Sequence, residues 1–152
     1  MSKEEMPEVV AKRLGYALKR AQHALRISMD EALRPLGLTV PQYAVLCAIE
    51  AETGLSNARL ARAAFVTPQT MQGVLANLEK NSLLVRVADP AHGRILRSGL
   101  TPQGRSLLQK AHRVVQKIEK RMVASFGRTD AARLAVALSK FADDFKKHKL
   151  QT

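Results

Sequence analysis

The stretch VTPQTMQGVLANLEKNSLLVR, residues 66–86, carries two different patterns. Apolar residues recur in it at three- and four-residue steps, as on one face of a helix: Met71, Val74, Leu75 and Leu78. The opposite face carries small and polar residues: Gln69, Gly73, Ala76 and Lys80. The period then changes to two, with Leu83, Val85 and Val87 alternating with Leu84, Arg86 and Ala88, as in a half-buried strand. The stretch therefore predicts an amphipathic helix followed at once by a strand.

A second helix is predicted just before this one. Ser56 is a typical N-cap residue, and the helix after it has a small apolar seam of Leu60, Ala61 and Ala64. Phe65 and Val66 end that helix, and Thr67 caps the next one with Pro68 at its first position, where a missing N–H costs nothing. Two helices joined by such a short turn are the outline of a helix-turn-helix.

The strand that begins at Leu83 is predicted to form a hairpin. Residues 89–93, DPAHG, read as a turn, and residues 94–100, RILRSGL, can pair back as a second strand. A two-stranded arm directly after a helix-turn-helix is a wing. Thr101 and Pro102 then open another helix, as Thr67 and Pro68 did.

Longer helices are predicted on both sides of this lobe. The first spans residues 8–34 and ends at Pro35 and Gly37. A short helix over 41–51 follows Thr39, opens on Pro41 and is broken by Gly54. A long helix runs from 102 to 126 and stops at Gly127, and Asp130 or Thr129 caps the last one.

The predicted fold class is mainly α with a small β-hairpin wing (α+β): a winged helix-turn-helix lobe flanked by N- and C-terminal dimerisation helices. The lobe covers residues 40–101, and the helical dimerisation region covers residues 8–36 and 102–148. The flanking helices have more apolar surface than one copy can bury, which predicts a homodimer.

The charge of the chain indicates a polyanionic partner. The 152 residues carry a net charge of +12, from 25 basic and 13 acidic residues. Aromatic residues make up only 4% and Trp is absent, which argues against a stacking platform for single-stranded nucleic acid. Double-stranded DNA fits the composition better.

Several other classes of protein are disfavoured. Apolar runs are shorter than the roughly 18 residues that a membrane helix needs, and residues 1–10 are charged, so we expect no membrane association and a cytoplasmic location. Cys47 is a single cysteine and the four His residues lack ligand spacing, so we expect no metal and no cofactor. Spacings typical of a nucleophile with its base or of a phosphate-binding loop are missing, so an enzyme is not predicted.

The polar face of the helix after Thr67 is the candidate for contact with base edges. Gln69, Gln72 and Asn77 have amide side chains that can donate and accept together, and Gly73 lets the helix approach a groove floor closely. Phosphates would meet the helix starts, where N–H groups are exposed: Ser56, Asn57, Thr67 and Thr70. Each of these residues is also explained as a cap or turn residue, and the amides as a solvated face.

The wing adds basic residues to this surface. Arg94, next to Gly93, is the best candidate to enter a minor groove. Arg86 and Arg97 are further candidates for DNA contact, although either can instead pair with Asp89 or with the backbone.

Residues 10–145 resemble the MarR family of bacterial winged-helix transcriptional regulators. The resemblance runs from LTVPQYAVLCAI through the helix-turn-helix and wing to LTPQGRSLL, and the family's wing motif is matched by Asp89, Arg94, Leu100, Thr101 and Gly104. The wing tip departs from the family: residues 90–93 read Pro-Ala-His-Gly where acid and Arg are usual, so the minor-groove contact depends on Arg94 alone.

The resemblance implies a homodimer on a pseudo-palindromic operator, with one recognition helix in each of two major grooves. It also implies a repressor that a small phenolic or aromatic-acid effector releases. The family's effector cleft lies between the dimer helices and the winged lobe, where this sequence offers Tyr16, Arg20, His23, Ile27, Tyr43 and Cys47. The alternative for these residues is dimer contacts or solvated charges.

Two other functions stay open at this point. Cys47 could be a redox switch, although its apolar neighbours indicate a buried, inert thiol and the family's hydroperoxide sensors carry the reactive cysteine in the first helix. A helical adaptor or structural dimer that binds no DNA would explain the long helices, but it leaves the wing and the polar helix face unexplained.

Overall fold

The computed structural model describes residues 7–94 and 96–148. These residues form two compact units, one up to Val115 and one from Gln116 onward. The elements are α1 (Glu8–Ala11), α2 (Leu14–Leu33), the 3-10 turn η1 (Arg34–Leu36), α3 (Val40–Ala51), α4 (Asn57–Ala63), α5 (Pro68–Lys80), β1 (Leu84–Ala88), β2 (Leu96–Leu100), α6 (Pro102–Phe126) and α7 (Arg128–His148). Helix α6 begins in the first unit and ends in the second.

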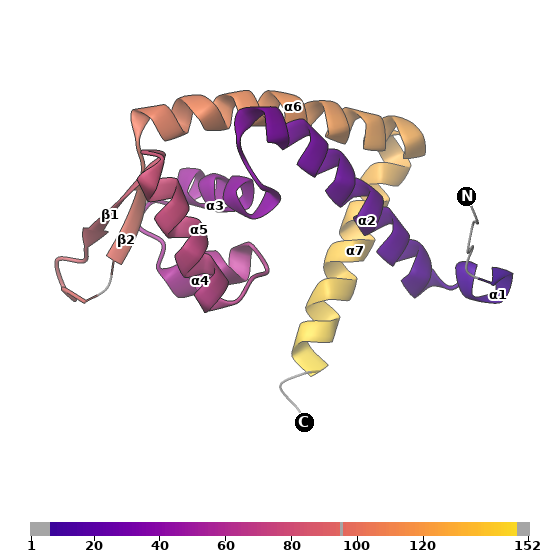
Figure 1. Ribbon diagram of the computed structural model, residues 1–152. Helices are drawn as coiled ribbons and strands as arrows, with labels where there is room; N and C mark the ends of the chain where they lie inside the picture. Colours follow the sequence, from indigo (N-terminus) through magenta and orange to yellow (C-terminus); the bar gives the residue numbers. More distant parts are fainter. Residues whose placement is uncertain (1–6, 95, 149–152) are drawn as a thin grey trace. The chain divides into compact units, whose positions relative to one another are not determined.

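The first unit is built around one apolar core. Its fully buried side chains come from each helix from α2 to α6 and from β1: Leu33, Val45, Leu46, Ile49, Leu60, Met71, Leu75, Leu78, Leu84 and Leu108. Figure 1 shows α3, α4 and α5 gathered beside the hairpin. Because α3 contributes three of these side chains and contacts α4, α5 and β2, it forms the centre of the lobe.

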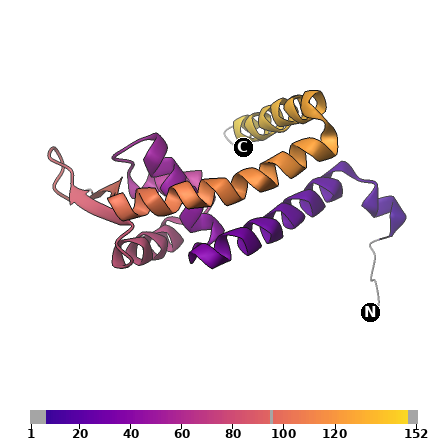
Figure 2. The same ribbon diagram turned by 90° about the horizontal axis from the view of Figure 1, so that it is seen from above.

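The hairpin is an antiparallel pair in regular register, from Leu84 opposite Leu100 to Ala88 opposite Leu96. Its tip projects beyond the helices of the first unit (Figures 1 and 2). The predicted wing is therefore present, and the fold class predicted from the sequence is confirmed.

The buried face of β1 differs from the face that a simple alternation from Leu83 suggests. Val85 and Val87 are 48% and 63% exposed, whereas Leu83 and Leu84 are both buried. Ser82, at φ 59°, turns the chain, and Leu83 N–H donates to the Leu78 carbonyl before the strand begins. The change of backbone direction thus buries two successive side chains.

The sequence predicts one continuous first helix, and this prediction is wrong: the structure has two helices, α1 and α2. Arg13 has an extended backbone, with ψ 136°, and separates α1 from α2. Val9 and Leu14 on either side are 74% and 84% exposed, so in the described residues tertiary packing does not hold the two segments in one helix. The predicted end is confirmed, with Gly37 at φ 69°.

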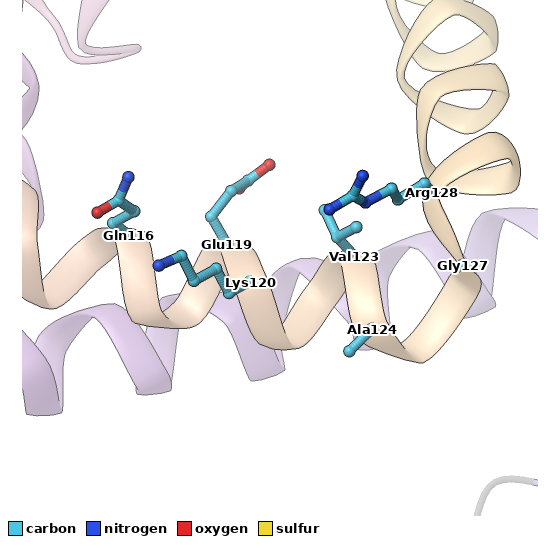
Figure 3. Close-up of a pocket in the computed structure, with 7 residues that line it drawn as sticks. All are labelled: Gln116, Glu119, Lys120, Val123, Ala124, Gly127 and Arg128. Atoms are coloured by element: carbon cyan, nitrogen blue, oxygen red, sulfur yellow. The ribbon is translucent and has the colours of Figure 1, made fainter.

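The second unit consists of the end of α6 and helix α7, which meet at Gly127 (Figure 3). Gly127 has φ 80°, a left-handed value that suits glycine, and its carbonyl accepts the Ala131 N–H. Helix α7 therefore begins at Arg128, before the predicted caps Thr129 and Asp130, which lie in its first turn. Its large apolar side chains are exposed, among them Leu134, Leu138, Phe141 and Phe145.

Candidate nucleic-acid interface

Helices α4 and α5 both begin at side-chain caps, as predicted. The Ser56 hydroxyl oxygen accepts from Arg59 N at 3.4 Å, and the Thr67 hydroxyl oxygen accepts from Thr70 N at 3.1 Å. The Thr67 hydroxyl also donates to Thr70 Oγ1 at 2.9 Å. These caps fix where each helix starts.

Helix α5 has the two faces that its sequence predicts. Met71, Leu75 and Leu78 are buried in the core, at 0%, 2% and 0% exposure. The other face is exposed along its length: Gln69, Gln72, Gly73, Ala76 and Lys80. A Cβ atom on Gly73 would meet nothing within 4 Å. This second face of α5 is therefore open to solvent and does not pack against the core.

Asn77 also lies on the exposed side of α5 but is tied into the structure. Its Oδ1 accepts from Gln42 Nε2 at 2.7 Å and from Asn81 Nδ2 at 3.1 Å. Gln42 is a buried polar residue of α3, 9% exposed. Asn77 therefore differs from Gln69 and Gln72, whose amides make no hydrogen bond within the described residues.

The turn of the wing is organised by Asp89, which is 8% exposed. Its carboxylate accepts from the backbone N–H groups of Ala91 and His92, at 2.8 and 3.3 Å, and from Arg97 Nε. Arg97 and these N–H groups hold the pKa of Asp89 below its usual range. Arg97 also donates to the Gly54 carbonyl at 2.5 Å, so it fastens the wing to the loop before α4.

The three wing arginines thus have different surroundings. Arg97 pairs with Asp89, the alternative that the sequence had left open for it. Arg86 pairs with Glu79 of α5, through Nε at 3.0 Å and Nη2 at 2.6 Å, and not with Asp89. Arg94 is exposed and makes no hydrogen bond or ion pair within the described residues. Of the three wing arginines, Arg94 is therefore the one whose guanidinium is not engaged by another described residue.

The start of α6 packs closely against the turn between α5 and β1. Thr101 Oγ1 accepts from Gly104 N at 2.9 Å and donates to the Ser82 carbonyl at 2.6 Å. The backbones approach so closely that a Cβ on Gly104 would lie 1.9 Å from the Leu83 oxygen. In the Leu-Thr-x-x-Gly motif at 100–104, the threonine therefore caps α6 and the glycine permits the close approach of the two backbones.

The residues predicted for an effector cleft fall into two groups. On α2, Tyr16 is half-buried, and Arg20, His23 and Ile27 are exposed. On α3, Tyr43 and Cys47 pack against the core. In the described part of the chain no hydrogen bond joins the two groups.

Tyr43 belongs to a hydrogen-bonded chain that the sequence did not indicate. Its hydroxyl lies 3.0 Å from His112 Nδ1, and His112 Nε2 lies 2.8 Å from Glu50 Oε2. The signal is absent from the sequence because 69 residues separate Tyr43 from His112. The chain of contacts connects α3 with α6.

Cys47 is held as a thiol. Burial, the largest cause, raises the pKa of Cys47, and a hydrogen bond with Tyr43 offsets only part of that effect. Since the thiolate is the reactive form, the geometry does not favour a redox role.

A surface recess of about 550 Å³ lies in the second unit, at the elbow between α6 and α7 (Figure 3). It is lined by Gln116, Glu119, Lys120, Val123, Ala124, Gly127 and Arg128. None of the residues predicted for an effector cleft line it.

Residues 7–94 and 96–148 contain no group of three or more His, Cys, Asp or Glu side chains that could hold a metal ion. In the same residues, no single helix is long and apolar enough to cross a membrane. Two successive segments, Leu14–Leu36 and Val40–Ala51, together have the length and composition of a membrane span, but the chain bends by 79° between them.

Known proteins share this architecture and sequence. The model of the MarR family matches residues 36–95. The HTH-type transcriptional repressor Rv2887 of Mycobacterium tuberculosis is 43% identical over 111 residues, 73% of this chain and 80% of the relative. The curated relatives of this chain are transcriptional regulators.

Solved structures agree over nearly the whole chain. The transcriptional repressor CouR, bound to a 23-mer DNA duplex, superposes with a TM-score of 0.84 at 30% identity, covering 93% of this chain and 99% of that one. Rv2887 in complex with salicylic acid superposes with a TM-score of 0.70 at 39% identity, covering 85% and 96%. The capped helix pair, the hairpin and these relatives lead to one conclusion: the chain belongs to the MarR family of winged helix-turn-helix transcriptional regulators.

Proposed function

We propose that the protein is a sequence-specific repressor that binds double-stranded DNA as a homodimer and is released by a small aromatic acid. The observation that carries the proposal is the exposed face of α5, which is polar, has no side chain at Gly73 and does not pack against the core. A helix with this face, capped at its start and followed by a wing, suits the major groove. The net charge of +12 supports a DNA partner.

The contacts to DNA divide by chemistry. Gln69 and Gln72 would meet base edges through their amides, beside the backbone of Gly73. Phosphates would meet the first turns of α4 and α5, at Ser56, Asn57, Thr67 and Thr70. Arg94 would enter the minor groove, and Arg86 and Arg97 would support the wing through their acidic partners.

A homodimer is supported by the exposed apolar side chains of the second unit. Leu138, Phe141 and Phe145 are 39%, 46% and 65% exposed on α7. A second copy would cover such a face, and two copies would match a two-fold operator. We therefore keep residues 8–36 and 102–148 as the proposed dimerisation region and residues 40–101 as the DNA-binding lobe.

The effector class is proposed from Rv2887, which is known in complex with salicylic acid and with p-aminosalicylic acid. CouR is known with p-coumaroyl-CoA, the thioester of an aromatic acid. Tyr16, Arg20, His23 and Ile27 of α2, with Tyr43 and Cys47 of α3, remain the proposed contacts. An arginine would pair with the carboxylate of the acid. Action on chromosomal DNA would place the protein in the cytoplasm.

Selection of bound duplexes from a random pool tests this function. We expect a two-fold motif whose half-sites lie about 10 bp apart. The recovered duplex is then used in competition with salicylate and p-coumarate, with benzyl alcohol as the control that lacks a carboxylate. Loss of binding with the acids alone supports the effector class, and unchanged binding with every acid contradicts it.

The same experiment separates the alternatives. A pool without a common motif would favour a helical adaptor. Release of the duplex by hydroperoxide in the wild type, but not in a Cys47→Ala variant, would favour redox sensing over ligand sensing.

A further inference from the structure

Four polar residues connect the start of α3 with the exposed end of α5. The Thr39 backbone N–H donates to Gln42 Oε1 at 2.9 Å, and Gln42 Nε2 donates to Asn77 Oδ1 at 2.7 Å. Asn81 Nδ2 donates to the same Asn77 oxygen at 3.1 Å and to the Asn77 backbone carbonyl at 2.9 Å. The network therefore begins and ends on backbone groups.

The backbone groups set the direction of every amide in the network. A backbone N–H can only donate, so the Gln42 atom that faces Thr39 N is the oxygen, and the atom that faces Asn77 is the NH₂ group. A backbone carbonyl can only accept, so the Asn81 atom that faces it is also an NH₂ group. Both neighbours of the Asn77 side chain are donors, and the Asn77 atom between them must be the oxygen.

The Asn77 oxygen has no remaining capacity as an acceptor. A carbonyl oxygen accepts through two lone pairs, and Gln42 and Asn81 occupy both. The Asn77 Nδ2 group makes no hydrogen bond within the described residues, and the residue is exposed. Asn77 therefore presents only N–H groups to a ligand of α5.

We infer that Asn77 reads guanine as a hydrogen-bond donor and that Gln42 is the positioning residue that makes it one. Guanine presents two adjacent acceptors, N7 and O6, in the major groove. Adenine is the usual partner of asparagine, but it also needs an acceptor for its N6 amino group, and the Asn77 oxygen is occupied. This inference rests on the proposed binding of DNA by α5.

Gln42 can impose this direction because it is buried and doubly held. It is 9% exposed, and its backbone N–H also donates to Thr39 Oγ1 at 3.3 Å, in a reciprocal capping box. Turning its amide over would place two N–H groups against each other at Thr39. Gln72, on the other flank of the exposed α5 face, has no such partner in the described residues and can turn its amide to suit adenine.

The first experiment compares selected motifs. Duplexes are selected with the wild type, with Asn77→Ala and with Gln72→Ala, a change on the opposite flank that should alter the preference at a different base pair and leave the guanine preference in place. We expect Asn77→Ala to lose its preference at one G·C pair per half-site, with at least about fivefold weaker binding to the wild-type motif. Replacing that guanine by 7-deazaguanine, which lacks the N7 acceptor, should weaken the wild type and leave Asn77→Ala unchanged.

The second experiment reverses the direction of Asn77. The double variant Gln42→Glu with Asn81→Ala keeps an acceptor for Thr39 N and places a second acceptor against Asn77, which must then turn its NH₂ group inward and its oxygen outward. We expect this variant to lose or reverse the preference at the same G·C pair and to keep the rest of the motif. Asn81→Ala alone is the control and should keep the wild-type preference.

A variant that is safe for folding gives an independent check. Asn77→Asp, at an exposed position, keeps the acceptor for Gln42 and replaces the outward NH₂ by oxygen. It should lose the guanine preference while its unfolding transition stays close to that of the wild type. A merely structural role is fulfilled by the acceptor that aspartate retains, and would therefore leave both the unfolding transition and the base preference in place.

The outcomes are distinct. An A·T pair at the Asn77-dependent position would overturn the inference, as would a wild-type motif in which Asn77→Ala alters no position. Unchanged guanine preference in folded Gln42→Glu with Asn81→Ala would overturn the role of Gln42. In these cases the proposed function stands, whereas a wild-type pool without any motif overturns the proposed function and this inference with it.

Discussion

Two helices of this protein open with the same tripeptide, Thr-Pro-Gln, at residues 67–69 and 101–103. In both, the threonine hydroxyl oxygen accepts a backbone N–H three residues later, at 3.1 Å for α5 and 2.9 Å for α6. In both, proline takes the first position of the helix, where its missing N–H costs nothing. Local structure at the two starts is thus the same.

The surroundings of the two starts are opposite. At α6, the Thr101 hydroxyl also donates to the Ser82 carbonyl, and Gly104 lies directly under the Leu83 carbonyl. At α5, Gln69, Thr70 and Gly73 are exposed. A capping sequence therefore determines where a helix begins, while the residues of the following turns determine whether it contacts the core or stays open to a ligand.

The glycines in the first turns should show the largest difference. In Gly104→Ala the new Cβ would lie 1.9 Å from the Leu83 oxygen, so two backbone segments must separate, and we expect a loss of about 3 kcal/mol in the free energy of unfolding. In Gly73→Ala the Cβ meets nothing within 4 Å, and the higher helix propensity of alanine should add about 1 kcal/mol. Urea denaturation of both variants measures the difference.

The opposite signs are the critical result. Equal destabilisation by the two substitutions would contradict the close approach at Gly104. Retained DNA binding by Gly73→Ala, measured on the selected motif, would show that the low outer face of α5 is not needed in the groove.

The glutamines of the two tripeptides should differ in DNA binding. Gln69 and Gln103 are both exposed and occupy the same position in their helices. Gln69→Ala should weaken binding to the selected motif by about 1–3 kcal/mol, because its amide would lose a base edge. Gln103→Ala should leave binding unchanged. Titration of labelled operator and of a scrambled duplex distinguishes base reading from general loss of affinity, which would weaken both duplexes equally.

The sequence predicted the elements that depend on local chemistry. Caps such as Ser56 and Thr67, and the stripe of Met71, Leu75 and Leu78, follow from residue type and spacing alone, and the structure confirms them. The polar face of α5 was found in the same way. The wing also followed from the change of period and the turn residues at 89–93.

Contacts between distant residues could not be predicted. The pairs of Gln42 with Asn77 and of Tyr43 with His112 join residues 35 and 69 positions apart, and only the packing of α3 brings them together. Thr39 and Gln42 do carry a visible signal, a capping box, but it gives no hint of the second partner. The break at Arg13 was also missed, because no proline or glycine marks it in the sequence and the extended backbone of Arg13 is seen only in the structure.

The caps themselves should show a smaller difference than the glycines. Thr101→Ala removes the acceptor for Gly104 N and the donor to Ser82 O, and we expect a loss of about 2 kcal/mol. Thr67→Ala removes an exposed cap and should cost about 1 kcal/mol. Serine at either position keeps the hydroxyl and should restore most of the stability. Equal losses at the two sites would mean that the contact with Ser82 contributes little.

The smallest effect concerns the wing that lies between the two helix starts. Both threonine caps are neutral and should be indifferent to pH, whereas the turn at Asp89 depends on a carboxylate whose pKa is held below its usual range by Arg97 and two backbone N–H groups. The stabilisation is therefore present above the ordinary pKa of aspartate and is lost as pH falls through the lowered value. Amide exchange at Ala91 and His92, which donate to Asp89, should accelerate as pH falls below the ordinary pKa of aspartate, about 4, relative to that at Thr70 and Gly104, after correction for intrinsic rates. In Asp89→Asn the two amides should exchange faster at neutral pH and lose this dependence, and persistent protection in acid would show that the turn holds without the carboxylate.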